Sequence, residues 1–231
     1  MIYRIAIRIK PSISLACSFV KQNKPQSQIT DTIDKKSSIT AGSSVSTEND
    51  QQKSSTIVVT DRRVVGRSVY EGVFDGVTGQ LVRGTIDTPG QITVDGKFED
   101  GKLVHGSVKK AGGFMMEGYF DGNAYPSEGV ITYPDGTVKT GAFDQGKVVK
   151  GSISRPDGST MTGSFDDKER LIKGTENTIQ NEVYQGEFKN GLLRKGSAKL
   201  RSGMIVRGEF GDDGKLVMGT ITYPDGRVDR V

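Results

Sequence analysis

The sequence predicts an all-β fold, an elongated antiparallel β-hairpin solenoid made of a single-sheet meander. Three observations predict it: a Gly-x-Phe triplet recurs, tight-turn signals separate the copies, and apolar residues alternate with polar ones. Successive triplets are 22–24 residues apart, so the array has about seven 22–24-residue repeats. The phenylalanines are Phe74, Phe98, Phe120, Phe143, Phe165, Phe188 and Phe210. A period this short is typical of stacked hairpins and too short for the blades of a β-propeller.

The first element in the chain is residues 1–20, a basic start followed by a short, moderately apolar stretch. This pattern favours an export signal, and Ala16-Cys17 partly resembles the cleavage box of a bacterial lipoprotein, in which the cysteine is lipidated. The acid-poor, Ser-containing start also fits an organellar transit peptide or a simple unstructured N-terminus. All three readings remain open, with Cys17 as the possible lipidation site.

Residues 21–56 follow as a Ser-, Thr-, Gln- and Lys-rich segment without apolar periodicity, which predicts a disordered linker. Residues 1–56 hold 8 basic and 4 acidic side chains, whereas residues 57–231 hold 24 of each. The net charge of +4 therefore belongs to the N-terminal segment, and the repeats are not expected to bind nucleic acid.

Residues 57–231 form the predicted repeat domain, and residues 141–163 serve as the model unit. A strand with Gly141 and Phe143 ends in a turn, a second strand passes Gly151, and the turn Pro156-Asp157-Gly158 closes the unit. The residue two before each first glycine shares a face with that glycine and the phenylalanine. We expect these apolar columns to form a thin layer, with each glycine leaving room for an aromatic ring of the neighbouring unit.

The units resemble MORN repeats, which are β-hairpin repeats of about the same period. The resemblance is carried by Tyr184-Gln-Gly186-Glu-Phe188-Lys-Asn-Gly191 and by the turns Tyr133-Pro-Asp-Gly136 and Tyr223-Pro-Asp-Gly226, and it extends over residues 68–231. Aromatic positions of the family are here mostly Phe, Val or Met, and residues 175–181 lack the Asp-Gly turn. The resemblance implies a scaffold for protein–protein contacts, homo-oligomerisation or association with phospholipid membranes.

Catalytic or metal chemistry finds little support in the sequence, because it has one histidine and one cysteine. We therefore expect no enzyme activity, cofactor, metal or small-molecule substrate. The best candidate for a binding surface is a basic column just before the second glycine of several units. Its members are Arg83, His105, Lys150, Lys173 and Lys195, with Glu128 and Met218 interrupting it. Such a row suits an anionic membrane surface or an acidic protein.

The main functional hypothesis is thus a non-enzymatic scaffold that associates with proteins or membranes. One alternative is an exported cell-envelope lipoprotein anchored through Cys17, and another is a regulatory subunit of an enzyme acting in trans. The corresponding locations are membrane-associated or exported, with a cytoplasmic location as the alternative.

Overall fold

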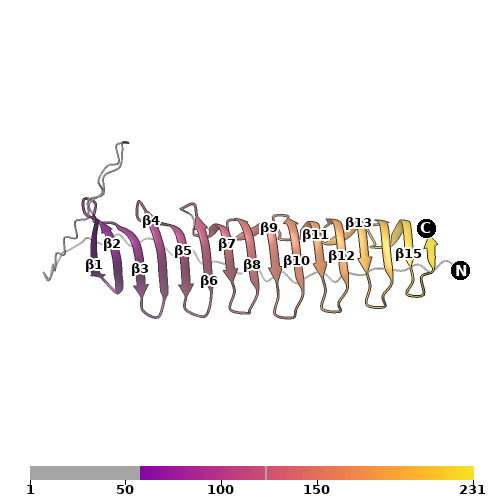
Figure 1. Cartoon of the computed structure of the whole chain (residues 1–231), viewed down its shortest axis with the longest axis horizontal. Helices are drawn as coiled ribbons and strands as arrows, with labels where there is room; N and C mark the ends of the chain where they lie inside the picture. Colours follow the sequence, from indigo (N-terminus) through magenta and orange to yellow (C-terminus); the bar gives the residue numbers. More distant parts are fainter. Residues whose placement is uncertain (1–57, 123) are drawn as a thin grey trace, which may run out of the picture.

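The computed structural model describes residues 58–122 and 124–231, and these form one antiparallel sheet of sixteen strands. Each strand pairs with its neighbours in the chain, so the strands lie side by side along the ribbon (Figure 1). This confirms the predicted single-sheet meander. The predictions for residues 1–20, including Cys17, and for residues 21–56 concern segments outside the described residues. The strands are β1 Val58–Val65, β2 Ser68–Asp75, β3 Leu81–Thr88, β4 Ile92–Glu99, β5 Lys102–Lys110, β6 Met115–Phe120, β7 Pro126–Thr132, β8 Val138–Asp144, β9 Lys147–Ser154, β10 Thr160–Phe165, β11 Leu171–Asn177, β12 Val183–Lys189, β13 Leu192–Lys199, β14 Ile205–Phe210, β15 Leu216–Thr222 and β16 Val228–Arg230.

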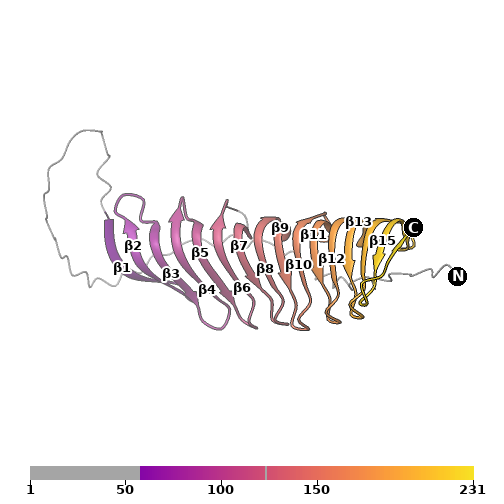
Figure 2. The ribbon, with the colours of Figure 1, turned by 45° about the vertical axis from the view of Figure 1, so that its right-hand side comes forward.

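The sheet has two more strands than seven two-strand units require. Strand β1 pairs with β2 ahead of the first Gly-x-Phe triplet, and the short β16 pairs with β15 at the other end. The turns lie along the two long edges of the ribbon, which twists gradually along its length (Figure 2). We call the edge that follows each phenylalanine the Phe edge and the opposite edge the Pro edge.

Every unit contains a β-bulge that the sequence pattern does not reveal directly. In the first unit, Val73 lies opposite Arg83 but Phe74 lies opposite Leu81, so Val82 is an extra residue. The same register shift occurs next to each of the other six phenylalanines. Leu81 and Ile86 are an odd number of residues apart, so strict alternation would place their side chains on opposite faces of the sheet. The extra residue between them lets both side chains join the same apolar layer.

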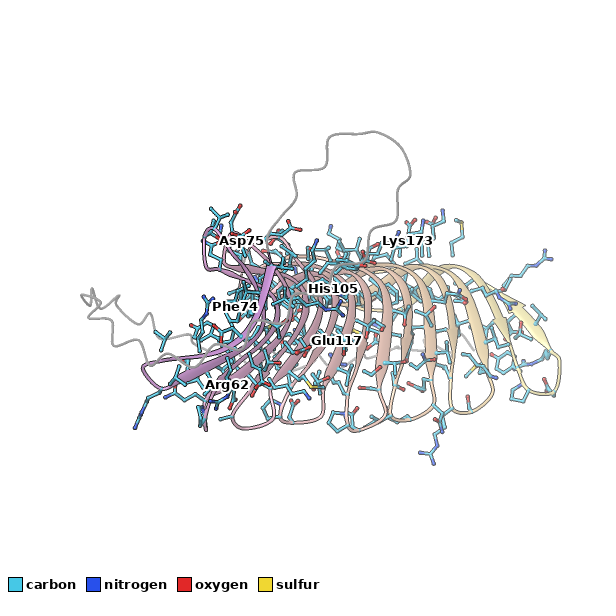
Figure 3. All side chains as sticks on the ribbon, turned by 60° about the vertical axis from the view of Figure 1, so that its left-hand side comes forward. Arg62, Phe74, Asp75, His105, Glu117 and Lys173 are labelled. Atoms are coloured by element: carbon cyan, nitrogen blue, oxygen red, sulfur yellow. The ribbon has the colours of Figure 1, made fainter. Side chains whose placement is uncertain are left out.

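The apolar layer covers one side of the sheet, which we call the inner face. Phe74 lies on the hollow side of the curved strands in Figure 3, and its side chain is only 2% exposed. Towards the Phe edge the layer contains the phenylalanines and their partners, such as Leu81 and Val148, and towards the Pro edge it contains residues such as Met116 and Ile131. A single sheet can bury these side chains because the strands curve and bring the two halves of the layer towards each other.

A row of fourteen glycines separates the two halves of the inner layer, with one glycine on each strand from β2 to β15. At Gly72, where φ is +151°, a Cβ would overlap the carbonyl oxygen of Arg83 and lie 2.7 Å from the Cα of Gly84. The expected role for these glycines was therefore wrong. They leave room for the backbone of the neighbouring strand, not for an aromatic ring.

The unit that lacks an Asp-Gly turn keeps the turn geometry through Asn181. This residue has φ of +61°, and its N–H donates to the carbonyl of Thr178 over 3.0 Å. Gly136 makes the equivalent bond to Tyr133 in the consensus turn, at 2.9 Å. Asparagine replaces glycine here because it tolerates the left-handed region better than other side chains do.

Two charged side chains interrupt the inner layer near its middle. Lys139 replaces an apolar residue on β8, and its Nζ lies 2.6 Å from a carboxylate oxygen of Glu169 in a Phe-edge turn. Glu169 also accepts the backbone N–H of Val148 at 3.0 Å, so this pair links the two halves of the layer. Glu176 on β11 has no ion pair of this kind with any described residue. Burial raises the pKa of its carboxyl, with the charge of Arg155 opposing the shift.

Candidate functional site: the outer face

The predicted basic column lies on the outer face of the sheet, opposite the buried layer. Arg83, His105, Lys150, Lys173 and Lys195 come from β3, β5, β9, β11 and β13, and each precedes the glycine of its strand. All five side chains are exposed. Figure 3 shows Lys173 towards the Phe edge, on the same side as Asp75, with Arg62 towards the opposite edge. The structure therefore places these residues in one row, which we call the basic row.

The register fills the gaps in the basic row with residues from the even-numbered strands. Each of these follows the glycine of its own strand and lies directly opposite its neighbours in the row. They are Val73, Lys97, Tyr119, Ala142, Ser164, Glu187 and Glu209. The electrostatic character of the row depends on these residues as much as on the cations predicted from the sequence.

At the C-terminal half of the sheet, carboxylates oppose the predicted cations. Lys173 Nζ lies 3.4 Å from Glu187 Oε1, and Lys195 Nζ lies 3.2 Å from Glu209 Oε1. These exposed pairs contribute little to stability, but their two carboxylates cancel the charge of the two lysines there. Among the cations of the predicted column, only those before β11 have no carboxylate directly opposite them.

At the N-terminal half, the basic row gains a cation. Lys97 on β4 lies opposite both Arg83 and His105, so three basic side chains occupy adjacent positions on β3, β4 and β5. They border a shallow depression of about 600 Å³, whose floor is the backbone of Gly84, Gly96 and Gly106. The centres of the His105 and Tyr119 rings are 4.4 Å apart, so Tyr119 borders the group of three basic side chains on the β6 side.

The bulges add a second row beside the basic row, nearer the Phe edge. Its members are Val82, Val104, Ser127, Val149, Ile172, Arg194 and Val217. Five of these are aliphatic, and Val149, Ile172 and Val217 are 40–64% exposed. The outer face thus carries a mostly aliphatic row, the bulge row, alongside the basic row. Sequence reasoning missed the bulge row because strict alternation assigns no second outward residue there.

The acidic side chains of the turns are engaged within the fold and are poor candidates for ligand binding. Asp75 accepts the backbone N–H groups of Thr78 and Val77, and the bond from Thr78 is the main cause of the lowered pKa of its carboxyl. Asp157 similarly accepts hydrogen bonds from both the hydroxyl and the N–H of Ser159, which lower the pKa of the Asp157 carboxyl.

Within residues 58–122 and 124–231, no group of histidine, cysteine and carboxylate side chains could hold a metal ion. In the same ranges no helix is long and apolar enough to cross a bilayer.

No protein-family model matches the chain, and a search of curated proteins finds no match. Membership of the MORN family therefore stays a prediction that depends on the residues quoted above.

Proposed function

We propose that this chain is a non-enzymatic, MORN-like repeat scaffold that associates with an anionic membrane surface through its outer face. The observation that carries the proposal is the pairing of the bulge row with the basic row. Four of the seven bulges set an aliphatic side chain beside a basic residue of that row: Val82 with Arg83, Val104 with His105, Val149 with Lys150 and Ile172 with Lys173. Of these four basic residues, only Lys173 forms an ion pair with a carboxylate on the strand opposite. Peripheral membrane binding needs these two components, an apolar contact at the interface and attraction to acidic headgroups.

An acidic protein is the competing partner, since a basic row alone would suit it equally well. The exposed aliphatic side chains favour the membrane, because an acidic polypeptide gains little from them. Homo-oligomerisation remains compatible with membrane association, since several copies would multiply weak contacts with a surface.

Flotation of the full chain with vesicles tests this proposal. We expect the protein to float with vesicles that contain phosphatidylserine and not with phosphatidylcholine alone, and to be released by salt. The variant Lys150→Ser/Ile172→Ser should lose most of this binding. The control Lys199→Ser/Ile179→Ser removes one lysine and one aliphatic side chain outside both rows, and it should float like the parent protein. Equal flotation with both vesicle types, or equal loss in both variants, would refute the proposed surface.

A second candidate is the exported lipoprotein anchored through Cys17, which is favoured by the basic start and by Ala16-Cys17. Mass spectrometry of the mature N-terminus tests it, and an intact, unmodified Met1 would exclude it. Both functions can hold together, because a lipid anchor and the outer face would act on the same membrane.

A further inference from the structure

We propose that Arg83, Lys97 and His105 form a binding site for the phosphate group of a phosphorylated polyol, either a soluble compound or the headgroup of a lipid. The inference deepens the proposed function and rests on the same outer face. It assigns one place on that face a specific ligand chemistry, whereas the two rows describe a general surface.

The three side chains converge because the register places them opposite one another. Arg83 on β3 lies directly opposite Lys97 on β4, and Lys97 lies directly opposite His105 on β5. Side chains directly opposite each other in antiparallel strands start about 5 Å apart. The backbone of the neighbouring glycines lines the depression between them, so a ligand can contact this floor directly.

In this cluster no carboxylate lies directly opposite a basic side chain, in contrast to the equivalent positions of the later units. The position of Lys97 is held by Glu187 and Glu209 in the sixth and seventh units, where each carboxylate pairs with the lysine opposite. Lys97 instead pairs along its own strand with Glu99 at 2.7 Å, and both side chains are more than half exposed. Arg83 forms no ion pair within the described part of the chain. Like charges directly opposite each other are unfavourable, and a bound anion would relieve that repulsion.

The donors suit a phosphate group. A guanidinium offers a planar pair of N–H groups, an ammonium adds a compact charge, and an imidazole adds a further N–H. A phosphate monoester has three oxygens and close to two negative charges, so it can engage all three donors. A carboxylate has only two oxygens and one charge, and would leave one cation unmatched.

Asp95 makes a bare anion a less suitable ligand than a polyol phosphate. Its carboxylate lines the same depression, across the glycine floor from Lys97, and accepts the hydroxyl of Thr85 at 2.8 Å. Two residues along a strand correspond to about 7 Å, so a polyol whose phosphate meets the cations extends a hydroxyl to Asp95. The neighbouring Glu117 on β6 adds negative charge to this side of the floor. The depression thus has a cationic wall for the phosphate and an acceptor wall for the polyol.

His105 allows a direct test because it is the only histidine in the chain, so its ring protons give resolved NMR signals. The full chain is titrated at fixed pH with myo-inositol 1-phosphate, with inorganic phosphate and with myo-inositol. We expect a saturable shift with myo-inositol 1-phosphate, at a dissociation constant of about 1 mM, weaker binding of inorganic phosphate and none of myo-inositol.

Lys97→Glu supplies the decisive variant, because this chain already folds with glutamate at the equivalent position of two other units. It should weaken binding of myo-inositol 1-phosphate at least tenfold. Lys199→Glu makes the same charge change at an exposed lysine outside both rows, and should leave the affinity unchanged. The absence of a saturable shift, or equal weakening by both variants, would overturn the assignment.

A parallel measurement identifies the source of the phosphate. Vesicles of phosphatidylcholine with and without phosphatidylinositol 4-phosphate are added, and flotation is compared between the parent protein and Lys97→Glu. If the parent protein floats with the phosphatidylinositol 4-phosphate vesicles and Lys97→Glu does not, the ligand is a lipid headgroup. If the parent protein shows the NMR shift with myo-inositol 1-phosphate but both proteins float equally, the ligand is a soluble compound. If the soluble ligand binds but phosphatidylserine vesicles do not, the proposed membrane function fails while this site stands.

Discussion

The glycine row gives the most direct test of how this sheet is built. In Gly163→Ala, the added Cβ would overlap the carbonyl oxygen of Lys173 and lie 2.8 Å from the Cα of Gly174, in a residue with φ of +151°. The backbone conformation alone costs about 1–3 kcal/mol for a residue with a side chain. Separating the two strands should cost a further 1–3 kcal/mol or so, because the obstacle is backbone and cannot rotate away. We therefore expect unfolding free energy to fall by about 2–6 kcal/mol.

The matched control is Gly158→Ala in a Pro-edge turn. Gly158 also has positive φ, +86°, but a Cβ there would meet no atom within 4 Å. It should lose only the conformational part, about 1–2 kcal/mol. Urea denaturation of the full chain, followed by tyrosine fluorescence and circular dichroism, gives both values, since the chain has seven tyrosines and no tryptophan. If the two variants lost the same stability, close backbone approach would not be the reason for the glycine row.

Three further predictions concern charged side chains at the inner layer. Glu176→Ile should raise stability by about 1–2 kcal/mol at neutral pH, because it removes a partly buried carboxylate and adds apolar burial. Since burial raises the Glu176 pKa, the parent loses stability as pH rises through that pKa, so the gain measured by urea denaturation should be larger at pH 7 than at pH 4. Lys139→Met should destabilise by about 1–3 kcal/mol by leaving Glu169 without its cation, and adding Glu169→Gln should restore most of the loss in a double-mutant cycle. Arg63→Ala should lower the midpoint of thermal unfolding by a few degrees, because the Arg63 guanidinium lies 3.9 Å from the centre of the Phe74 ring and donates to the carbonyl of Gly79. An unchanged midpoint would show that these contacts do not stabilise the end of the sheet at β1.

The recurrence of Gly-x-Phe was enough to predict the hairpin array, because one stacking unit repeated at a fixed interval has few ways to bury an apolar face. The same pattern did not reveal why the glycines recur. Space for a ring and space for a neighbouring backbone both call for glycine, and only the pairing of Gly72 with Gly84 distinguishes them. A clue was present in the sequence: glycine occurs on both strands of every unit, although one side would suffice to admit a ring.

The candidate site was predicted only in part, because its character is set across strands. Arg83 and His105 are visible as members of a column, but Lys97 belongs to the other strand of its unit and joins them only through the register. The neutralisation of Lys173 and Lys195 by opposing glutamates depends on that register too. The bulge was signalled by the odd separation of Leu81 and Ile86, since two apolar columns on one face require an even spacing or an extra residue.

The architecture places the residues that stabilise the sheet and the proposed binding rows on opposite faces. The inner face, the glycine row and the turns hold the stack together, whereas residues of the basic and bulge rows project from the opposite side of the same strands. Substitution in the outer rows therefore changes charge without opening the apolar layer. The change from lysine to glutamate at one register position, between the second unit and the sixth and seventh, is such a substitution within this chain. It gives the two halves of one repetitive sheet different electrostatics, so an anionic ligand that needs several cations should bind at β3–β5 and not uniformly along the ribbon.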